Sequence, residues 1–261
     1  MKVGVIGKGF VGGALYGDFL DKGVDISAYD KYKKIGRIED VLSSDIIFLC
    51  LPTPFIEGAS FDKSSIYEVI DYLNDKKYSG IVVLKSTVEP GFCKDISGKY
   101  DFDICHNPEF LTARTANDDF KNQKHIVLGK TKSSDKFDNL ILLYSKLYPD
   151  AKISICTSCE SESMKIFCNT FYASKIMIFN EFFSLCNKMG LDFNKIKNLM
   201  LKNDWINPMH TNVPGPDGKL AFGGACFPKD TGALLEFMKR KDVICEVLHS
   251  VVSECKKIRK D

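Results

Sequence analysis

The sequence predicts an α/β fold in which a doubly wound, mostly parallel sheet over residues 1–156 is followed by an all-helical domain over residues 157–261. Three observations carry this prediction. A glycine-rich turn joins a short apolar strand to an amphipathic helix within residues 1–20. Further short apolar strands then alternate with helical segments, which is typical of parallel sheets covered by helices. From residue 160 to 188 the chain has neither glycine nor proline and reads as one long apolar helix.

The composition is that of a globular protein, with 261 residues of which 44% are hydrophobic and 27% charged. The 36 basic and 34 acidic residues nearly balance, which argues against nucleic acid or an anionic membrane as a partner. No apolar run reaches the roughly 18 residues that span a bilayer. The first residues resemble a strand and turn rather than a signal peptide, so we expect a cytoplasmic protein. No metal site is expected, because the histidines are scattered and the C-x-x-C at Cys156–Cys159 has no second pair.

The turn after the first strand reads G-x-G-x-x-G. The spacing alone is weak evidence, but here a strand precedes it and a helix follows it, as in a dinucleotide-binding βαβ unit of the Rossmann type. The first glycine makes the tight turn, the second lets backbone approach a pyrophosphate, and the third lets helix and strand pack closely. The start of the helix offers N–H groups to phosphates. The predicted cofactor-binding residues here are Gly7, Lys8, Gly9, Phe10, Val11 and Gly12.

The second strand, VDISAYD, ends in Asp30. A carboxylate at this position accepts hydrogen bonds from the adenosine ribose and repels a 2′-phosphate, which favours NAD over NADP. The alternative is that Asp30 is a solvated turn residue. The lysines that follow it weaken the preference, since cations there can accept a phosphate: Lys31, Lys33 and Lys34.

Polar residues follow the next three apolar strands, which lie in SDIIFLCLPTP, SGIVVLKSTVEPG and FDICHNPEF. Ligands bind at the carboxyl ends of strands in such sheets, so an active site is predicted at this edge. Two further strands, KHIVLG and AKISIC, flank a helix over about 134–147. The polar residues at these strand ends are Thr53, Thr87 and Glu109.

The long helix over 160–188 is apolar on most of its circumference, so a partner subunit is expected to cover it. Lys165 and Asn169 are four residues apart and therefore share one face. The alternative is that Lys165 has no function and only extends its ammonium from the apolar helix to solvent. Its pairing with Asn169 favours a functional role. A short helix, FNKIKNLMLKN, a loop rich in glycine and proline, and two helical stretches near 230–240 and 243–258 complete this half.

Cys226 differs from most of the other nine cysteines because it lies outside the apolar runs, in GGACFPKD at a predicted helix start. A helix N-terminus and neighbouring cations stabilise a thiolate, and Lys229 is three residues away. These features favour a reactive thiol at Cys226, with a structural cysteine as the alternative.

Eight motifs occur in an order that resembles the UDP-glucose/GDP-mannose 6-dehydrogenase family. They are GKGFVG, AYD, LPTP, KSTVEPG, NPEFL, E-x-x-K-x-x-x-N over 162–169, FNE at 179–181 and FGGACFPKD, and they cover the chain almost end to end. The resemblance implies an NAD-dependent, four-electron oxidation of a nucleotide-sugar C6 alcohol to the uronate, with UDP-glucose the commonest substrate. GDP-mannose, a UDP-N-acetylhexosamine, or a catalytically decayed NAD-binding dimer are the alternatives.

The resemblance also implies roles for individual residues. Cys226 attacks the C6 aldehyde and carries a thiohemiacetal and then a thioester. Lys165 and Asn169 stabilise the developing oxyanion. Glu109 is the base for the hydrolytic water, with a turn carboxylate as the alternative. Thr87 and Asp230 hold the water and the lysine in place.

The same resemblance implies a homodimer through helix 160–188 and two sets of binding residues. The cofactor set adds Asp30, Thr53, Pro54, Ser86, Thr87 and Lys229 to the glycine turn. The substrate set is Glu109, Phe110, Leu111, Lys165, Asn169, Phe222 and Gly223.

The sequence also departs from the family's pattern. Ala113 replaces a second glutamate, and Trp205 lies near the position of an arginine that reaches substrate phosphate across the dimer. The connection after Asp30 is short, and the loop before Cys226 carries the extra residues VPGPDGKLA. No segment resembles the family's C-terminal nucleotide-binding domain, so we expect an enzyme of minimal size.

Overall fold

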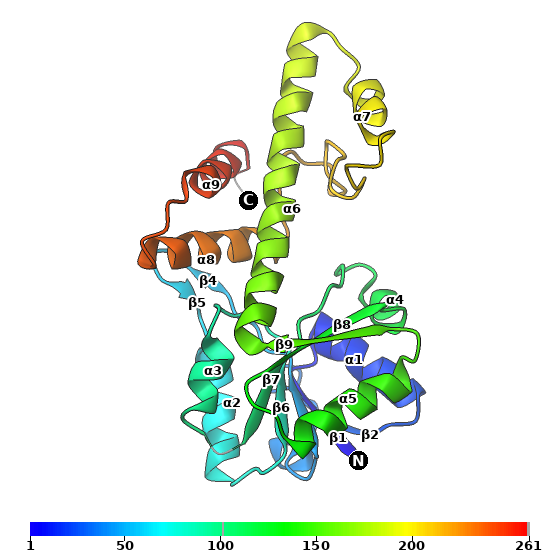
Figure 1. The fold of residues 1–261 in the computed structure, drawn as a ribbon, viewed down its shortest axis with the longest axis vertical. Coiled ribbons are helices and arrows are strands. Elements are labelled where there is room, and N and C mark those ends of the chain that lie inside the picture. The colour runs from blue at the N-terminus through cyan, green and yellow to red at the C-terminus, as the bar shows by residue number, and fades with distance from the viewer. Residues whose placement is uncertain (101, 260–261) are drawn as a thin grey trace. The chain divides into compact units, whose positions relative to one another are not determined.

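The computed structural model describes residues 1–100 and 102–259, which form two compact units (Figure 1). The first unit comprises Met1–Pro54 and Asp62–Lys165. The second comprises Phe55–Phe61 and the chain from Ile166 onward. The first unit therefore extends past residue 156, where the sequence places the domain boundary, and a short segment of the first half of the chain belongs to the second unit.

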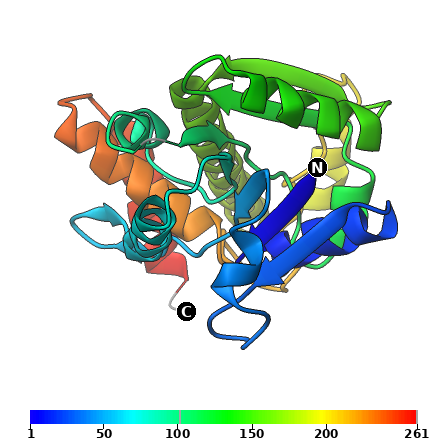
Figure 2. The same ribbon diagram turned by 90° about the horizontal axis from the view of Figure 1, so that it is seen from below.

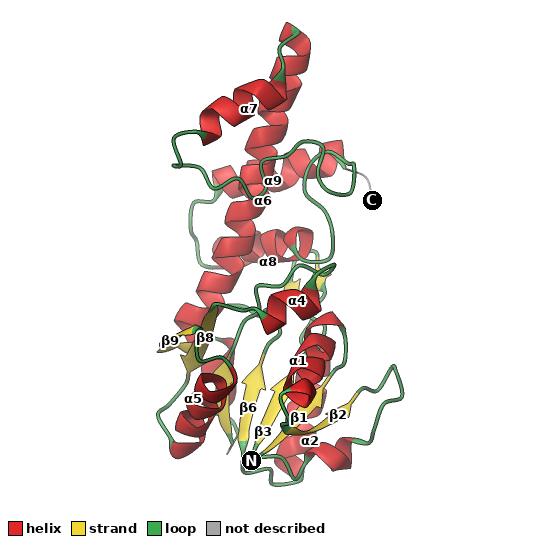
Figure 3. Ribbon diagram, turned by 90° about the vertical axis from the view of Figure 1, so that its right-hand side faces the viewer, coloured by secondary structure: helices red, strands yellow, loops and turns green. Residues whose placement is uncertain are grey.

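A seven-stranded sheet forms the centre of the first unit, in the order β2-β1-β3-β6-β7-β8-β9 (Figure 3). Neighbouring strands are parallel except for β7 and β8, so the prediction of a mostly parallel sheet is confirmed. The strands are β1 (Lys2–Ile6), β2 (Asp25–Tyr29), β3 (Ile46–Leu49), β6 (Ile81–Leu84), β7 (Asp103–His106), β8 (His125–Lys130) and β9 (Lys152–Thr157).

Helices cover both faces of this sheet, because successive strand residues point to opposite sides. In β3, Ile46 and Phe48 pack on one side of the sheet, whereas Ile47 and Leu49 pack on the opposite side. Figure 2 shows helices on both sides of the sheet. The doubly wound arrangement is thus confirmed. The elements are α1 (Phe10–Asp21), α4 (Ala116–Lys121) and α5 (Asp135–Leu147) on one face, and the 3₁₀ helix η1 (Ile38–Val41), α2 (Ser64–Asp75) and α3 (Phe92–Ser97) on the other.

The long helix is present as α6 (Ser158–Met189), with defined signals at both ends. At its start, the Glu160 carboxylate accepts hydrogen bonds from the N–H and hydroxyl of Thr157, and the Thr157 hydroxyl accepts one from the Glu160 N–H. At its end, Gly190 adopts φ +67° and Leu191 N–H returns to the Cys186 carbonyl. The predicted single helix is confirmed.

The second unit is helical except for a two-stranded antiparallel sheet, β4 (Phe55–Ile56) and β5 (Ser60–Phe61), which packs against α8. Phe61 joins a core with Ile166 and Leu234, and Phe222 joins a second core with Met177. These contacts bury one face of α6 against the rest of the unit. The other helices are α7 (Phe193–Leu201), α8 (Phe227–Arg240) and α9 (Glu246–Ile258).

Candidate active site and cofactor site

The glycine turn between β1 and α1 has the geometry that each glycine was predicted to supply. Gly7 adopts φ +90°, and a Cβ on it would lie 2.5 Å from the Cys50 carbonyl oxygen. A Cβ on Gly12 would lie 2.0 Å from the Gly7 carbonyl oxygen, so only glycine lets helix and turn approach this closely. Gly9 faces open space, which leaves its backbone accessible to a bound group. The turn therefore fits a dinucleotide phosphate.

Asp30 lies at the end of β2 and organises the same turn. Its carboxylate accepts hydrogen bonds from the backbone N–H groups of Lys8 (2.6 Å), Lys33 (2.8 Å) and Tyr32 (3.0 Å). Burial alone would raise the pKa of Asp30, but these hydrogen bonds, strongest from Lys33, lower it below its usual value. The carboxylate is thus ionised where it can face a ribose.

The lysines after Asp30 are engaged within the protein. The Lys31 ammonium pairs with Glu68 at 2.6 Å, and the Lys33 ammonium donates to the Lys8 carbonyl at 2.6 Å. Lys34 adopts a left-handed conformation, with φ +55°. Lys31 and Lys33, two of the three cations that follow Asp30, therefore already have oxygen partners, which favours NAD.

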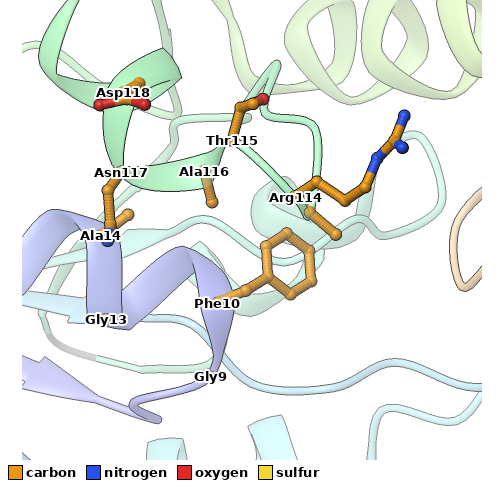
Figure 4. A pocket seen from close by; sticks show the side chains of 10 residues that line it. Gly9, Phe10, Gly13, Ala14, Arg114, Thr115, Ala116, Asn117 and Asp118 are labelled. Carbon is orange, nitrogen blue, oxygen red and sulfur yellow. The ribbon is translucent and has the colours of Figure 1, made fainter.

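A pocket of about 390 Å³ opens at the start of α1 (Figure 4). One wall is the first turn of the helix, and the other is the loop that follows β7 together with the start of α4. Ala113, where the family's pattern has a second glutamate, lies in this second wall. The carboxylate that the sequence lacks would therefore stand beside the glycine turn. The described residues that line the pocket are Gly9, Phe10, Gly13, Ala14, Ala113, Arg114, Thr115, Ala116, Asn117 and Asp118.

Hydrogen bonds join the polar residues that follow β3 and β6. The Thr53 hydroxyl donates to the Thr87 carbonyl at 2.8 Å. The Ser86 hydroxyl donates to the Leu51 carbonyl and accepts from the Leu51 N–H. Thr53, Ser86 and Thr87 are all buried, and Pro54 closes the loop with a carbonyl that accepts from Asp62 N–H. The bonds hold the two loops together, and cofactor binding by these residues stays a prediction.

Glu109 and Lys165 form a largely buried ion pair in the first unit. The Lys165 ammonium lies 3.0 Å from Glu109 Oε1 and 2.5 Å from the Glu109 backbone oxygen. The second carboxylate oxygen of Glu109 accepts from Leu111 N–H at 2.6 Å. Phe110 is exposed, and its ring stacks on His125 with the Lys165 ammonium 5.6 Å from the ring centre. The predicted base and the predicted oxyanion lysine are thus brought together.

A second buried lysine supports the same loop. Lys85, at the carboxyl end of β6, donates to the Asn107 backbone oxygen (3.1 Å) and to Asn107 Oδ1 (2.9 Å). Asn107 in turn accepts from the Tyr144 hydroxyl at 2.5 Å and donates to the Val127 carbonyl at 2.9 Å. Burial lowers the pKa of Lys85 to about 8. This network was not predicted from the sequence.

His106, one residue before Asn107, is completely buried. Its Nδ1 lies 2.8 Å from the Ser161 hydroxyl oxygen, and its Nε2 has no hydrogen-bond partner among the described residues. Burial, followed by the positive charges of Lys85 and Lys165, lowers the pKa of His106 to about 3. The imidazole is therefore neutral at physiological pH.

Glu162, in the E-x-x-K-x-x-x-N motif, fixes the start of α6 against α3. Its carboxylate accepts from the N–H groups of Gly91 (2.6 Å) and Cys93 (2.8 Å). The side chain is fully buried, and burial raises its pKa. Because Lys165 lies one turn later on the same helix, this contact also positions the Lys165 side chain.

The second unit holds the other predicted catalytic residues around the start of α8. Cys226 is the N-cap residue of that helix, as the sequence predicts. Asp230, one turn later, is fully buried and accepts from Asn169 Nδ2 at 2.6 Å. Its other oxygen pairs with the Lys229 ammonium at 2.5 Å, and that ammonium lies over the Phe61 ring at 4.8 Å. The lysine that Asp230 holds within this unit is therefore Lys229.

The loop before Cys226 is anchored by Arg259. The Arg259 guanidinium pairs with Asp217 at 2.5 Å, and a Cβ on Gly223 would lie only 2.1 Å from the guanidinium carbon. Phe222 is buried, whereas Trp205 is 90% exposed. Substrate contacts by Phe222 and Gly223 stay predictions, because their packing here explains them without a ligand.

Two classes of site find no support among the described residues. No group of three or more His, Cys, Asp or Glu side chains is arranged to hold a metal ion within 1–100 and 102–259. In the same part of the chain, no helix is both long and apolar enough to cross a membrane.

Comparisons with known proteins match both halves of the chain. Residues 36–148 match the NAD binding domain of the UDP-glucose/GDP-mannose dehydrogenase family, and residues 159–254 match its central domain. The UDP-glucose 6-dehydrogenase of Rickettsia prowazekii is 32% identical over 220 residues, which are 81% of this chain and 49% of that protein. The GDP-mannose 6-dehydrogenase of Pseudomonas putida is 30% identical over 230 residues, 82% of this chain and 51% of that protein. The chain thus spans about half the length of these curated relatives.

The solved structure of a UDP-glucose dehydrogenase from Pyrobaculum islandicum has a similar fold. It superposes with a TM-score of 0.85 over 98% of this chain and 68% of that chain, at 22% identity. At this identity the likeness concerns the fold alone. The two domain matches, one after the other along most of the sequence, show that this chain belongs to the UDP-glucose/GDP-mannose dehydrogenase family.

Proposed function

We propose that the chain oxidises the C6 alcohol of a nucleotide sugar to a carboxylate, with two NAD per sugar, through an intermediate bound to Cys226. The observation that carries the proposal is the position of Cys226 at the N-terminus of α8, one turn before the buried Asp230 that binds Asn169 and Lys229. UDP-glucose is the substrate we expect, since UDP-glucose 6-dehydrogenases are among the relatives at about 30% identity. We place the reaction in the cytoplasm.

The residues divide the chemistry between them. NAD, when bound, supplies a hydride acceptor for each of the two oxidations. Cys226 adds to the aldehyde from the first oxidation, forming the C–S bond of a thiohemiacetal, which the second oxidation converts to a thioester. Glu109 takes a proton from water, the water attacks the thioester, and the C–S bond breaks to release the carboxylate and the thiol. Lys165 and Asn169 donate to the oxygen on C6 when it carries negative charge.

The glycine turn, Asp30 and the first turn of α1 would hold NAD. Gly9 leaves space for the diphosphate, and the ionised Asp30 carboxylate would accept from the ribose hydroxyls. Thr53, Pro54, Ser86, Thr87 and Lys229 complete the proposed cofactor set. Glu109, Phe110, Leu111, Lys165, Asn169, Phe222 and Gly223 form the proposed substrate set.

The stoichiometry of NADH formation tests the reaction. We expect two NADH per sugar consumed when the chain is supplied with NAD and each member of a panel of nucleotide sugars. Cys226→Ser should abolish turnover and still bind NAD, whereas the matched control Cys159→Ser, at an exposed cysteine, should keep turnover. One NADH per sugar with release of free aldehyde would exclude the thioester route.

The choice of nucleotide sugar is the finer part of the proposal. GDP-mannose is the second candidate substrate, because a GDP-mannose 6-dehydrogenase is as similar as several of the UDP-glucose enzymes. A UDP-N-acetylhexosamine belongs to the same panel. NAD binding without turnover of any sugar in the panel would instead favour the decayed NAD-binding dimer.

We also propose that two copies pair through α6. Six large apolar side chains on this helix are 40% to 65% exposed, and their spacing of three, four or seven residues places them on one face. An apolar stripe of this length favours a second subunit as its cover. The stripe consists of Phe167, Phe171, Ile178, Phe182, Leu185 and Met189.

Light scattering coupled to gel filtration tests the pairing. Phe171→Glu should convert a dimer to a monomer, because it places a charge at the most exposed side chain of the stripe. Ile244→Glu, at a side chain that is 88% exposed and does not belong to α6, is the matched control and should leave the dimer intact. A monomeric unmodified chain would refute this part of the proposal.

A further inference from the structure

The pocket beside the glycine turn has an unusual cation in its wall. Arg114 is the one basic residue among the described residues that line it. It lies in the loop between β7 and α4, and Figure 4 shows the Phe10 ring pointing toward it. Asp118, the one acidic residue in the same lining, lies at the opposite end of the view, beyond Asn117. The end of the pocket next to Phe10 is therefore its positive end.

Arg114 has no oxygen partner among the residues that the structure describes. Its guanidinium forms neither an ion pair nor a hydrogen bond with any residue in the part of the chain that is described, although the adjacent Thr115 hydroxyl donates to Asp119 at 2.8 Å. A guanidinium offers five N–H donors in a planar fork that matches the oxygens of a phosphate. An accessible ligand could therefore occupy all of them.

The lysines near the turn are directed elsewhere. The Lys8 ammonium lies 3.7 Å from the centre of the Tyr16 ring, and the Lys33 ammonium donates to the Lys8 carbonyl. The donors that the turn itself offers are backbone N–H groups. Those of Phe10, Val11 and Gly12 are free for a ligand, since they begin α1 and have no carbonyl one turn earlier in the helix. A cation on the other side of a bound diphosphate would add a full positive charge to these donors and the helix dipole.

We propose that Arg114 binds the diphosphate of NAD from the side opposite the glycine turn, so that the diphosphate lies between the first turn of α1 and the guanidinium. The small side chain of Ala113 leaves room beside it, and the exposed Gly9 lets the diphosphate approach the backbone. The inference concerns the cofactor of the NAD binding domain. It does not depend on the proposed sugar substrate or on the thioester route.

Binding measurements without substrate test the inference, with NADH, ADP-ribose and adenosine as ligands. Arg114→Gln should lower the affinity for NADH and for ADP-ribose by about tenfold to a hundredfold, which is the loss expected when a hydrogen-bonded charged pair is removed. Adenosine, which has no phosphate, should bind both proteins equally. Arg114→Lys should recover part of the loss, since it keeps the charge but not the fork. Lys121→Gln, an exposed lysine at the end of α4, is the matched control for net charge.

Three outcomes would overturn the inference. Unchanged affinity of Arg114→Gln for ADP-ribose would show that the guanidinium does not contact the diphosphate. An equal loss for adenosine would place Arg114 near the base rather than the phosphates. An equal loss of affinity in Lys121→Gln would show that the effect comes from the net charge of the protein and not from a contact of Arg114. Failure of turnover with intact NADH binding would instead count against the proposed reaction and leave this inference standing.

Discussion

Lys85 and Lys165 are two buried lysines that bind the same loop in the same way, with one chemical difference. Each ammonium donates to the backbone oxygen and to a side-chain oxygen of one residue, Asn107 for Lys85 and Glu109 for Lys165. The side-chain oxygen belongs to a neutral amide in the first pair and to a carboxylate in the second. The lysine with the amide partner has its pKa lowered to about 8, because burial outweighs the more distant charge of Glu109.

The comparison shows that one loop holds two buried lysines whose side-chain partners differ in charge. The amide fixes Lys85 without a compensating charge, so Lys85 can act as a support that is tied to Tyr144 and β8 through Asn107. The Glu109 carboxylate also accepts from Leu111 N–H, and in the proposed reaction it would act as a base once Lys165 moves to a substrate oxygen. The predictions below alter one member of this comparison at a time.

The largest effect is expected from Glu109→Gln, which makes the second pair resemble the first. The amide can still hold Lys165 but cannot take a proton from water, so thioester hydrolysis should slow by about 10²- to 10⁴-fold. A burst of NADH followed by a stall, with acylated Cys226 detected by mass spectrometry, would show this. Unchanged steady-state turnover would remove Glu109 from the hydrolytic step.

Lys165→Ala should lower the maximal rate by about 100-fold or more, because a fixed donor to the developing oxyanion is lost. Steady-state kinetics at saturating NAD measure this. Lys188→Ala, at an exposed lysine on the same helix, is the matched control. A change confined to the substrate KM would mark Lys165 as a binding residue only.

Lys85→Met should alter how stability depends on pH. The folded protein releases the Lys85 proton near pH 8, and the unfolded chain near the usual value of 10.5. Between these values the unfolded chain binds more protons than the folded protein. The burial of Lys85 therefore lowers the free energy of unfolding by its full amount below pH 8. The free energy of unfolding then rises as pH increases toward 10.5. The whole change is about 3 kcal/mol.

Urea unfolding at about pH 7.5 and pH 9.5 measures the difference, and Lys85→Met should lack much of the rise that the unmodified chain shows. Lys188→Met, at an exposed lysine on α6, is the comparison variant. Identical pH dependence in Lys85→Met and the unmodified chain would mean that Lys85 is not a buried cation.

The smallest effect is expected from His106→Gln, and it falls in the acid range. The pKa of His106 is about 3 in the folded protein against 6.5 in an ordinary histidine. The unfolded chain therefore binds more protons between these values, and stability is lost as pH falls below about 6.5. From about pH 7 to pH 5 the unmodified chain should lose about 2 kcal/mol more than His106→Gln. Parallel unfolding curves at the two pH values would contradict this.

Much of the fold could be read from local patterns. Gly7 and Gly12 mark the turn between β1 and α1, and the stretch without glycine or proline marks α6, because both signals depend on neighbouring residues. The hairpin Phe55–Phe61 was missed as a part of the second unit, since its packing against α8 joins residues more than 160 positions apart. Arg114 was missed because it belongs to no motif and becomes noticeable only beside the pocket.

The candidate site shows the same division. The sequence by itself determined the glycine turn, Asp30 at a strand end, Cys226 at a helix start and the shared helix face of Lys165 and Asn169, since each follows from the periodicity or capping of one element. Only the tertiary structure decided that Lys85 meets an amide and Lys165 a carboxylate, because the partners lie 22 and 56 residues away. The charge that a buried side chain keeps depends on the atoms that replace its water, and only the folded chain specifies those atoms.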